Sequence, residues 1–282
     1  MDTNDSEPDS VIIKPTTEGI SIITLNRQHK RNAVNKATAQ KLYDAFLGFE
    51  SDESQKVCVF HGDNGTFCAG FDLQELAKTQ GSKQSIQHPE PVDINGRNIG
   101  PMGPSRLQIQ KPVICAVSGY AVAGGLELSL FADMRVVEED AVFGVFCRRW
   151  GVPLIDGGTV RLQAIVGLGR ALDMILTGRA VGAQEALAMG LANRVVPKGK
   201  GFDEAMEIAR QLVGFPQGCM NADRASCYYA AYNATSFTDA MHNEFDNGIK
   251  IVETESIEGA AKFSGGAGRH GAFGGARKQG QL

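Results

Sequence analysis

The sequence lacks the long apolar runs and basic clusters that mark two large classes of protein. No stretch of its 282 residues approaches the roughly 18 apolar positions that a membrane-spanning helix needs. The net charge is −4, and no basic run is longer than the short cluster at residues 198–200. Because nucleic-acid binding relies on clustered Lys and Arg, we expect neither a nucleic acid nor a membrane as a partner.

Metal-binding and disulfide patterns are missing as well. The six cysteines are scattered, mostly among apolar neighbours, and none form the CxxC spacing typical of zinc sites. The five histidines share no metal-binding spacing either. The sequence therefore predicts reduced, packed thiols and no metal site.

The chain ends carry no clear targeting signal. The first residues are acidic and have neither the apolar core of a secretory signal nor the Arg-rich pattern of a mitochondrial presequence. The final residues, 280–282, only weakly match a peroxisomal signal. We expect a cytoplasmic protein, with mitochondrial and peroxisomal locations as open alternatives.

What is present is an average globular composition with a strong alternation of elements. Hydrophobic residues make up 43% and charged residues 21%, which is enough to bury a sizeable core. Apolar runs and helical spacing predict strands at residues 10–14, 20–25, 56–61, 112–117, 134–137 and 142–143, and helices at 38–49 and 126–132. Strands that alternate with helices in this way predict an α/β fold with parallel strands, built as a repeated ββα core.

The last third of the chain reads as mainly helical. Helices are predicted at residues 171–176, 183–189, 202–213, 220–231 and 236–254, interrupted by one short strand at 194–196. We divide the chain into a disordered start (1–9), a ββα core (10–197), a helical oligomerisation region (198–263) and a flexible Gly-rich tail (264–282). The helical region either packs back on the core or swaps onto a neighbouring subunit. Residues 81–104 form a long loop that we expect to be functional or mobile.

Two loops stand out, at residues 65–73 and 118–128, because each follows a buried strand and opens a helix. Both are rich in small residues, which let a ligand approach the main chain. Exposed amides at a helix start are oriented donors that favour developing negative charge. Glycines before helices are common, so either loop alone is weak support, but the two together indicate a ligand site.

These loops belong to a larger set of motifs. The set comprises residues 23–27, 31–33, 67–73, 118–128, 141–153, 157–159 and 190–197. In combination they resemble the crotonase (enoyl-CoA hydratase/isomerase) superfamily, over about residues 11–271. The resemblance implies a spiral of ββα units with a helical C-terminal region, an acyl-CoA substrate, no cofactor beyond that coenzyme A, and trimers that often pair into hexamers.

The resemblance also implies the catalytic groups. The amides of Phe71 and Gly124 would form the oxyanion hole for the thioester oxygen, on which an enolate develops. Glu127 matches the first catalytic glutamate of family hydratases, and burial among leucines would raise its pKa toward use as a general acid or base. The alternative is a glutamate that complements its own helix dipole.

One position departs from the family pattern. Cys147 stands where hydratases carry their second glutamate, and a thiol cannot hold water as a carboxylate does. Asp156 is the compensating candidate, unless it serves only as an N-cap or turn residue before Gly157. Cys147 as a nucleophile is a further alternative. Arg148 and Arg149 would either bind a carboxylated acyl tail or pair with acids at a subunit contact.

The family pattern further implies the residues that contact the coenzyme A part of the substrate. They are Arg27, Arg31, Ala33, Ala69, Gly70, Phe71, Asp72, Leu73 and Gly124. We therefore expect an acyl-CoA lyase or isomerase of the hydratase type in fatty acid metabolism. The alternatives are thioester hydrolysis, decarboxylation or dehalogenation on the same fold, or an acyl-CoA-binding pseudoenzyme.

Overall fold

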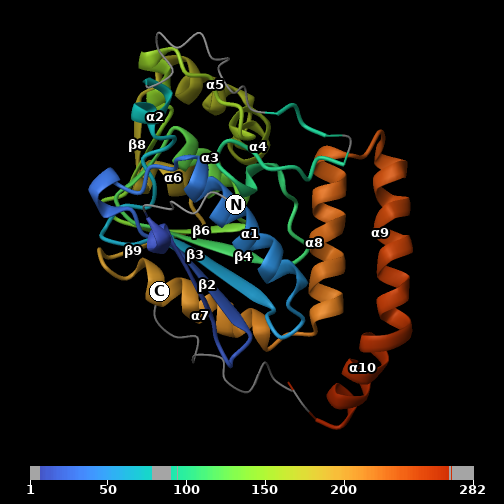
Figure 1. Cartoon of the computed structure of the whole chain (residues 1–282). Helices are drawn as coiled ribbons and strands as arrows, with labels where there is room; N and C mark the ends of the chain where they lie inside the picture. Colours follow the sequence, from blue (N-terminus) through green and yellow to red (C-terminus); the bar gives the residue numbers. More distant parts are fainter. Residues whose placement is uncertain (1–6, 78–89, 94, 267, 269–282) are drawn as a thin grey trace. The chain divides into compact units, whose positions relative to one another are not determined.

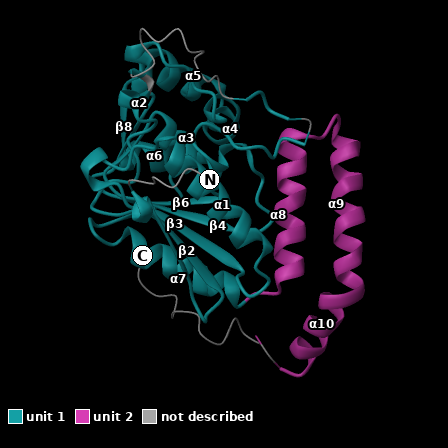
Figure 2. Ribbon diagram, in the orientation of Figure 1, with its two compact units in different colours: residues 1–214 teal, residues 215–282 magenta. Residues whose placement is uncertain are grey.

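The computed structural model describes residues 7–77, 90–93, 95–266 and 268 (Figure 1). Contacts divide the chain into two compact units, residues 1–214 and 215–282 (Figure 2). Among the described residues, no helix has both the length and the apolar character to cross a membrane. The expected disordered start and Gly-rich tail lie mostly outside the described residues, as does much of the long loop expected at 81–104.

The first unit is built on a six-stranded sheet in the order β1-β2-β3-β4-β6-β9. Its strands are β1 (Val11–Pro15), β2 (Ile20–Leu25), β3 (Val57–Gly62), β4 (Val113–Val117), β6 (Met134–Glu138) and β9 (Arg194–Val196). The pair β1–β2 is antiparallel and forms a hairpin, and the remaining pairs of this sheet are parallel. A second sheet joins β5 (Tyr120–Val122), β7 (Val142–Gly144) and β8 (Ala180–Gly182).

Helices follow most of the strands. They are α1 (Lys36–Ser51), α2 (Leu73–Ala77), α3 (Gly124–Phe131), α4 (Gly158–Val166), α5 (Leu168–Thr177), α6 (Ala183–Ala188) and α7 (Gly201–Val213), with short 3-10 turns at Pro8–Ser10, Gln28–Lys30, Pro104–Arg106 and Phe146–Trp150. The predicted α/β alternation is confirmed. The elements α2, α4, β5 and β8 were not predicted, because they are short or carry no clear apolar period.

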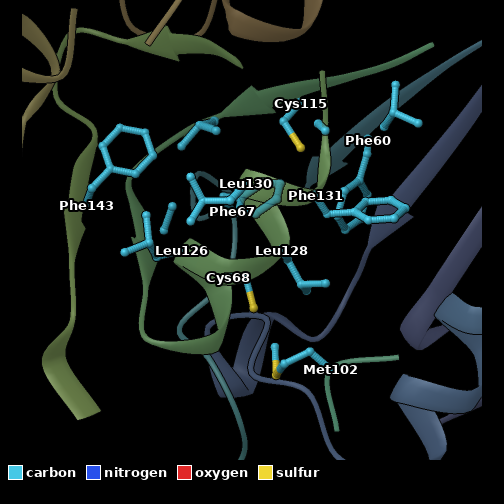
Figure 3. Close-up of a cluster of buried hydrophobic side chains, with 14 of the residues drawn as sticks. Phe60, Phe67, Cys68, Met102, Cys115, Leu126, Leu128, Leu130, Phe131 and Phe143 are labelled. Carbon is cyan, nitrogen blue, oxygen red and sulfur yellow. The ribbon is translucent and has the colours of Figure 1, made fainter. Parts of the chain in front are cut away.

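The larger hydrophobic core lies where α1 and α3 pack against one face of the main sheet. Phe46 of α1 packs edge-on against Phe60 of β3 and Phe131 of α3, with ring centroids 5.3 and 4.9 Å apart. Figure 3 shows part of this cluster, in which Leu126, Leu128 and Leu130 project from α3. A helix that is buried all round, as α3 is, needs an apolar sequence on every side, so a glutamate within it is unusual.

The second core lies where α7 covers the other face of the sheet. Ala205, Met206, Ile208 and Ala209 of this helix pack against strand residues that include Val59 and Ile114. This packing makes α7 part of the first unit. The structural division therefore falls after Gly214, whereas the sequence placed the boundary at residue 197.

The second unit is entirely helical in its described part. It contains α8 (Gln217–Tyr232), α9 (Phe237–Ile251), a π-helical turn (Val252–Ser256) and α10 (Ile257–Ser264), which confirms the expected helical C-terminal region. The helices α8 and α9 lie side by side (Figure 1). The Glu255 carboxylate accepts the amides of Gly218 and Cys219 at 2.9 and 2.7 Å, which caps the start of α8.

Candidate active site

The first ligand loop is held by a short stretch of main-chain pairing. The amide of Val34 donates to the carbonyl of Gly70, and the amide of Asp72 donates to the carbonyl of Val34, both at 2.8 Å. Phe71 lies between these two bonds. Within the described part of the chain its own amide donates to no backbone acceptor, so it is available to a ligand.

The second loop brings the start of α3 against the first. A Cβ on Gly70 would lie only 3.1 Å from the amide nitrogen of Gly124, so the two loops approach more closely than a larger residue allows. Ala123, just before the helix, has φ 54° and ψ −125°, a strained conformation that costs on the order of 1–3 kcal/mol. The structure thus places the Phe71 and Gly124 amides on adjoining loops, as an oxyanion hole requires.

Glu127 lies one turn into α3 and is 3% exposed. Its Oε1 accepts the amides of Asp156 and Gly158 at 2.9 and 2.8 Å. Burial raises the pKa of the carboxyl to about 7, with the Asp156 charge as the next cause, while the two backbone hydrogen bonds act in the opposite direction. The carboxyl therefore contacts the segment that begins α4, and its pKa lies near neutral pH.

Asp156 is as deeply buried as Glu127. Its Oδ1 accepts the amide of Met102 at 3.0 Å and the hydroxyl of Ser105. Burial raises the pKa of this carboxyl, and the Ser105 hydrogen bond is the largest effect that lowers it. The N-cap position of α4 is Gly157, so Asp156 is not the N-cap residue, whereas its role as a turn residue before Gly157 stays a prediction.

Cys147 lies on the 3-10 turn after β7 and is 6% exposed. Burial and the neighbouring charge of Glu127 both raise the pKa of its thiol. This is the opposite of what an activated thiolate nucleophile requires. Arg148 and Arg149 point elsewhere, because they donate to the carbonyls of Ile175 and Gly178 at the C-terminal end of α5.

Arg161 of α4 is a site residue that the sequence analysis missed. Its guanidinium donates to the carbonyl of Ser105 at 2.7 Å and to the carbonyl of Leu107 at 3.3 Å. It also reaches the carbonyl of Asp156 at 3.4 Å. Arg161 thereby ties the segment 105–107 to the start of α4. An arginine three residues after a Gly-Gly pair carries no period or motif of its own, and only the fold reveals its partners.

The residues expected to contact coenzyme A form one continuous region. The amide of Ala69 donates to the carbonyl of Arg31 at 3.1 Å, which places residues 31–33 beside residues 69–73. Arg31 and Leu73 are exposed. Ala33 and Phe71 are half-buried, whereas Gly70 is buried.

Arg27 has a different environment from the other members of this region. Its guanidinium is 3% exposed and forms ion pairs with Glu7 at 2.6 Å and Asp72 at 3.4 Å. It also donates to the carbonyl of Ala33. Arg27 and Asp72 therefore brace the loop from inside, because a charge that is buried in this way must be paired. In the described part of the chain, no group of three or more His, Cys, Asp or Glu residues could hold a metal ion.

Comparisons with known proteins identify the family of the chain. A family model described as enoyl-CoA hydratase/isomerase matches residues 15–263. The chain is 34% identical over 216 residues to the enoyl-CoA hydratase EchA19 of Mycobacterium tuberculosis, covering 74% of this chain and 76% of the relative. It is 36% identical over 196 residues to the carnitinyl-CoA dehydratase of Escherichia coli, covering 68% and 70%.

Solved structures of enoyl-CoA hydratases have the same fold as this chain. An enoyl-CoA hydratase from Mycobacterium tuberculosis aligns with a TM-score of 0.80 at 29% identity, over 91% of this chain and 96% of that one. An enoyl-CoA hydratase from Bacillus anthracis aligns with a TM-score of 0.79 at 26% identity and the same coverage. The fold and the paired loops define a crotonase-type protein. The chain belongs to the enoyl-CoA hydratase/isomerase family, which confirms the expected superfamily, and it is a hydratase-type enzyme.

Proposed function

We propose that the protein adds water to, or removes it from, a 2-enoyl-CoA thioester, with Glu127 as the acid and base. The observation that supports this most is the Glu127 carboxyl itself, which is buried one turn after Gly124 and has a pKa raised to about 7. A group with that pKa donates and accepts a proton with similar ease at neutral pH.

In this proposal the amides of Phe71 and Gly124 bind the thioester oxygen. Attack of water at the β-carbon moves an electron pair onto that oxygen, and the two amides stabilise the enolate that results. Both hydrogen bonds to Glu127 end on Oε1, which leaves Oε2 to exchange a proton with water or with the α-carbon. The main-chain donors at Asp156 and Gly158 fix the carboxyl in place for this exchange.

Asp156 is the second carboxyl of the proposed site. In family hydratases a second glutamate, at the position of Cys147, holds the water that attacks the β-carbon. The Cys147 thiol is protonated and cannot hold water as a carboxylate does, so we assign this function to Asp156. The charge of Asp156 is the second cause of the raised pKa of Glu127. Two carboxyls that influence each other in this way tend to ionise one after the other, so one holds the proton while the other accepts one.

A shift of the double bond is the second candidate reaction, and Cys147 is the observation that favours it. Isomerisation needs a carboxyl that moves a proton between two carbons, but it needs no second group to hold water. Glu127 and Asp156 supply the carboxyls for either reaction. The coenzyme A part of the substrate would bind at residues 31–33 and 69–73. Neither reaction requires a cofactor beyond this coenzyme A.

The test is turnover of crotonyl-CoA, followed as loss of the absorbance of the conjugated thioester. Wild type is compared with Glu127→Gln and Cys147→Glu. We expect an active wild type and a loss of about 10²–10⁴-fold in Glu127→Gln, with affinity for coenzyme A retained. A wild type that is inert beside an active Cys147→Glu variant would instead show that the natural reaction is not hydration.

The helix α9 carries an exposed apolar surface that suits contact between subunits. Exposed apolar side chains of α9, at Phe237, Met241 and Phe245, recur every four residues and form one stripe on the helix. Such a stripe favours burial against another chain, so we propose a homotrimer or a hexamer that uses the second unit. The relatives from Mycobacterium tuberculosis and Escherichia coli support a cytoplasmic location.

A further inference from the structure

Glu7 is a charged residue that the proposed chemistry does not use, and its carboxylate contacts three side chains of residues 27–35. Glu7 precedes residue 15, where the match to the family begins, so the family pattern assigns it no role. Arg27 donates from Nε to Oε2 of Glu7 at 2.6 Å and from Nη2 to Oε1 at 3.3 Å. Nε2 of His29 lies 2.8 Å from Oε1, and the side-chain amide of Asn35 donates to Oε2 at 3.5 Å.

The main chain around Glu7 is anchored to the rest of the first unit. Residues Pro8–Ser10 form a 3-10 turn. Lys41 of α1 donates to the carbonyl of Glu7. The amide of Asn26 donates to the carbonyl of Ser10 at 2.8 Å. The segment is thus held on both sides of the turn, so the position of the Glu7 carboxylate does not depend on its ion pair alone.

Arg27 connects the Glu7 carboxylate to the two segments that are expected to contact coenzyme A. Its guanidinium is 3% exposed, donates to the carbonyl of Ala33 and pairs with Asp72 at 3.4 Å. Asp72 directly follows Phe71, whose amide is one donor of the proposed oxyanion hole. Of the two acidic partners of the guanidinium, Glu7 is the closer, at 2.6 Å. Glu7 therefore supplies the shorter of the two ion pairs that compensate a buried cation.

We infer that Glu7 is a positioning residue for the binding of coenzyme A. Its charge holds the Arg27 guanidinium in place, and the guanidinium in turn holds residues 31–34 and 69–73. This inference rests on the proposed function, in which these segments bind the coenzyme A part of the substrate. Without the charge of Glu7, the buried guanidinium is less well compensated, so Arg27 turns toward solvent and releases Ala33 and Asp72. The two segments must then be ordered when the ligand binds, which lowers the apparent affinity.

The test is calorimetric titration of the full chain with free coenzyme A, for wild type, Glu7→Gln and Glu7→Asp, after thermal melting has shown that each variant folds. We expect Glu7→Gln to bind about tenfold more weakly than wild type. Glu7→Asp keeps a carboxylate and should bind more tightly than Glu7→Gln. Hydrogen exchange of the amides in residues 31–34 and 69–73, measured without ligand, should be faster in Glu7→Gln than in wild type.

Glu18→Gln is the matched control, because it removes the charge from another ion pair, which Glu18 forms with Arg210 of α7 at 2.9 Å. It should keep the wild-type affinity. The inference is overturned if Glu7→Gln binds coenzyme A as wild type does, or if Glu18→Gln loses as much affinity. Tighter binding by Glu7→Gln would also overturn it, since Glu7 would then compete with the phosphates of coenzyme A for Arg27.

The same titration separates this inference from the proposed function. A wild type that binds no coenzyme A would overturn both. Weaker binding by Glu7→Gln, in a protein that does not turn over crotonyl-CoA, would overturn the proposed reaction and leave the role of Glu7 standing.

Discussion

At the scale of single residues, the site depends on two carboxyls that are buried and accept hydrogen bonds from uncharged donors. These donors are the amides of Asp156 and Gly158 for Glu127, and the amide of Met102 and the hydroxyl of Ser105 for Asp156. Burial raises the pKa of both carboxyls, and the neutral hydrogen-bond donors only partly offset it. A salt bridge at either carboxyl would lower the pKa and remove the proton that the reaction needs at neutral pH.

The Ser105 hydroxyl should set the pKa of Asp156. Because its hydrogen bond stabilises the charged carboxylate, Ser105→Ala should raise the pKa of Asp156 further. Asp156 would then lose its charge at a higher pH, and the acidic limb of the rate profile should move upward by about one pH unit or more. Ser21→Ala, which removes a buried hydroxyl bonded to Gln55, is the control and should leave the profile in place. An unchanged acidic limb in Ser105→Ala would mean that the charge of Asp156 does not control the rate.

Sequence and structure agree best for residues whose role is local. Glu127 could be predicted because a charge inside an apolar helix start is visible in the sequence. Asp156 was named, but its partners Met102 and Ser105 lie more than 50 residues away along the chain. Its contacts therefore depend on how the hairpin at Gly100–Gly103 folds back, which no local pattern indicates.

At the scale of secondary structure, the strands and longer helices followed from their periodicity, and the shorter elements did not. The parallel strands are near-continuous apolar runs, which are easily recognised. The start of α4 is set by Gly157, with φ 90°, and by the tertiary contacts of Arg161. The strand β5 has only three residues and is defined by its pairing with β7. Such elements are determined by contacts between residues far apart in the sequence, so local sequence patterns do not predict them.

The apolar stripe of α9 should be required for assembly. Phe245→Glu places a charge in the middle of the stripe, where burial against another chain would cost several kcal/mol, so we expect smaller species. Analytical ultracentrifugation of the variant and of wild type measures this directly. Lys250→Glu introduces the same residue about 140° around the helix and should leave the size unchanged. Equal masses for wild type and Phe245→Glu would rule out this face as the contact.

At the scale of the whole molecule, the site reduces the stability of the fold. Burial raises the pKa of Glu127 from 4.5 to about 7, so the folded protein holds a proton that the unfolded chain has released between these pH values. Stability is therefore lost as the pH rises through this window. The loss at pH 8 amounts to about 3 kcal/mol as an order of magnitude.

Glu127→Gln should recover much of this stability, because the amide is neutral and keeps an oxygen that accepts the bonds from Asp156 and Gly158. We expect the variant to be more stable than wild type at pH 8 and nearly equal to it at pH 4.5, in urea denaturation at both values. Glu244→Gln, an exposed position on α9, serves as the control and should show no such difference. If Glu127→Gln were less stable than wild type at pH 8, the buried Glu127 carboxylate would not be the group that lowers the stability there.

The role of Glu127 in proton transfer is tested most directly by deuterium exchange at the α-carbon of butanoyl-CoA in heavy water, followed by NMR. This saturated thioester cannot be hydrated, so exchange reports only proton transfer under the oxyanion hole. We expect exchange by wild type and a rate about 10²–10⁴-fold lower for Glu127→Gln, with butanoyl-CoA still bound. Exchange by Glu127→Gln at the wild-type rate would show that a group other than Glu127 moves the proton, and the proposed role of Glu127 would be wrong.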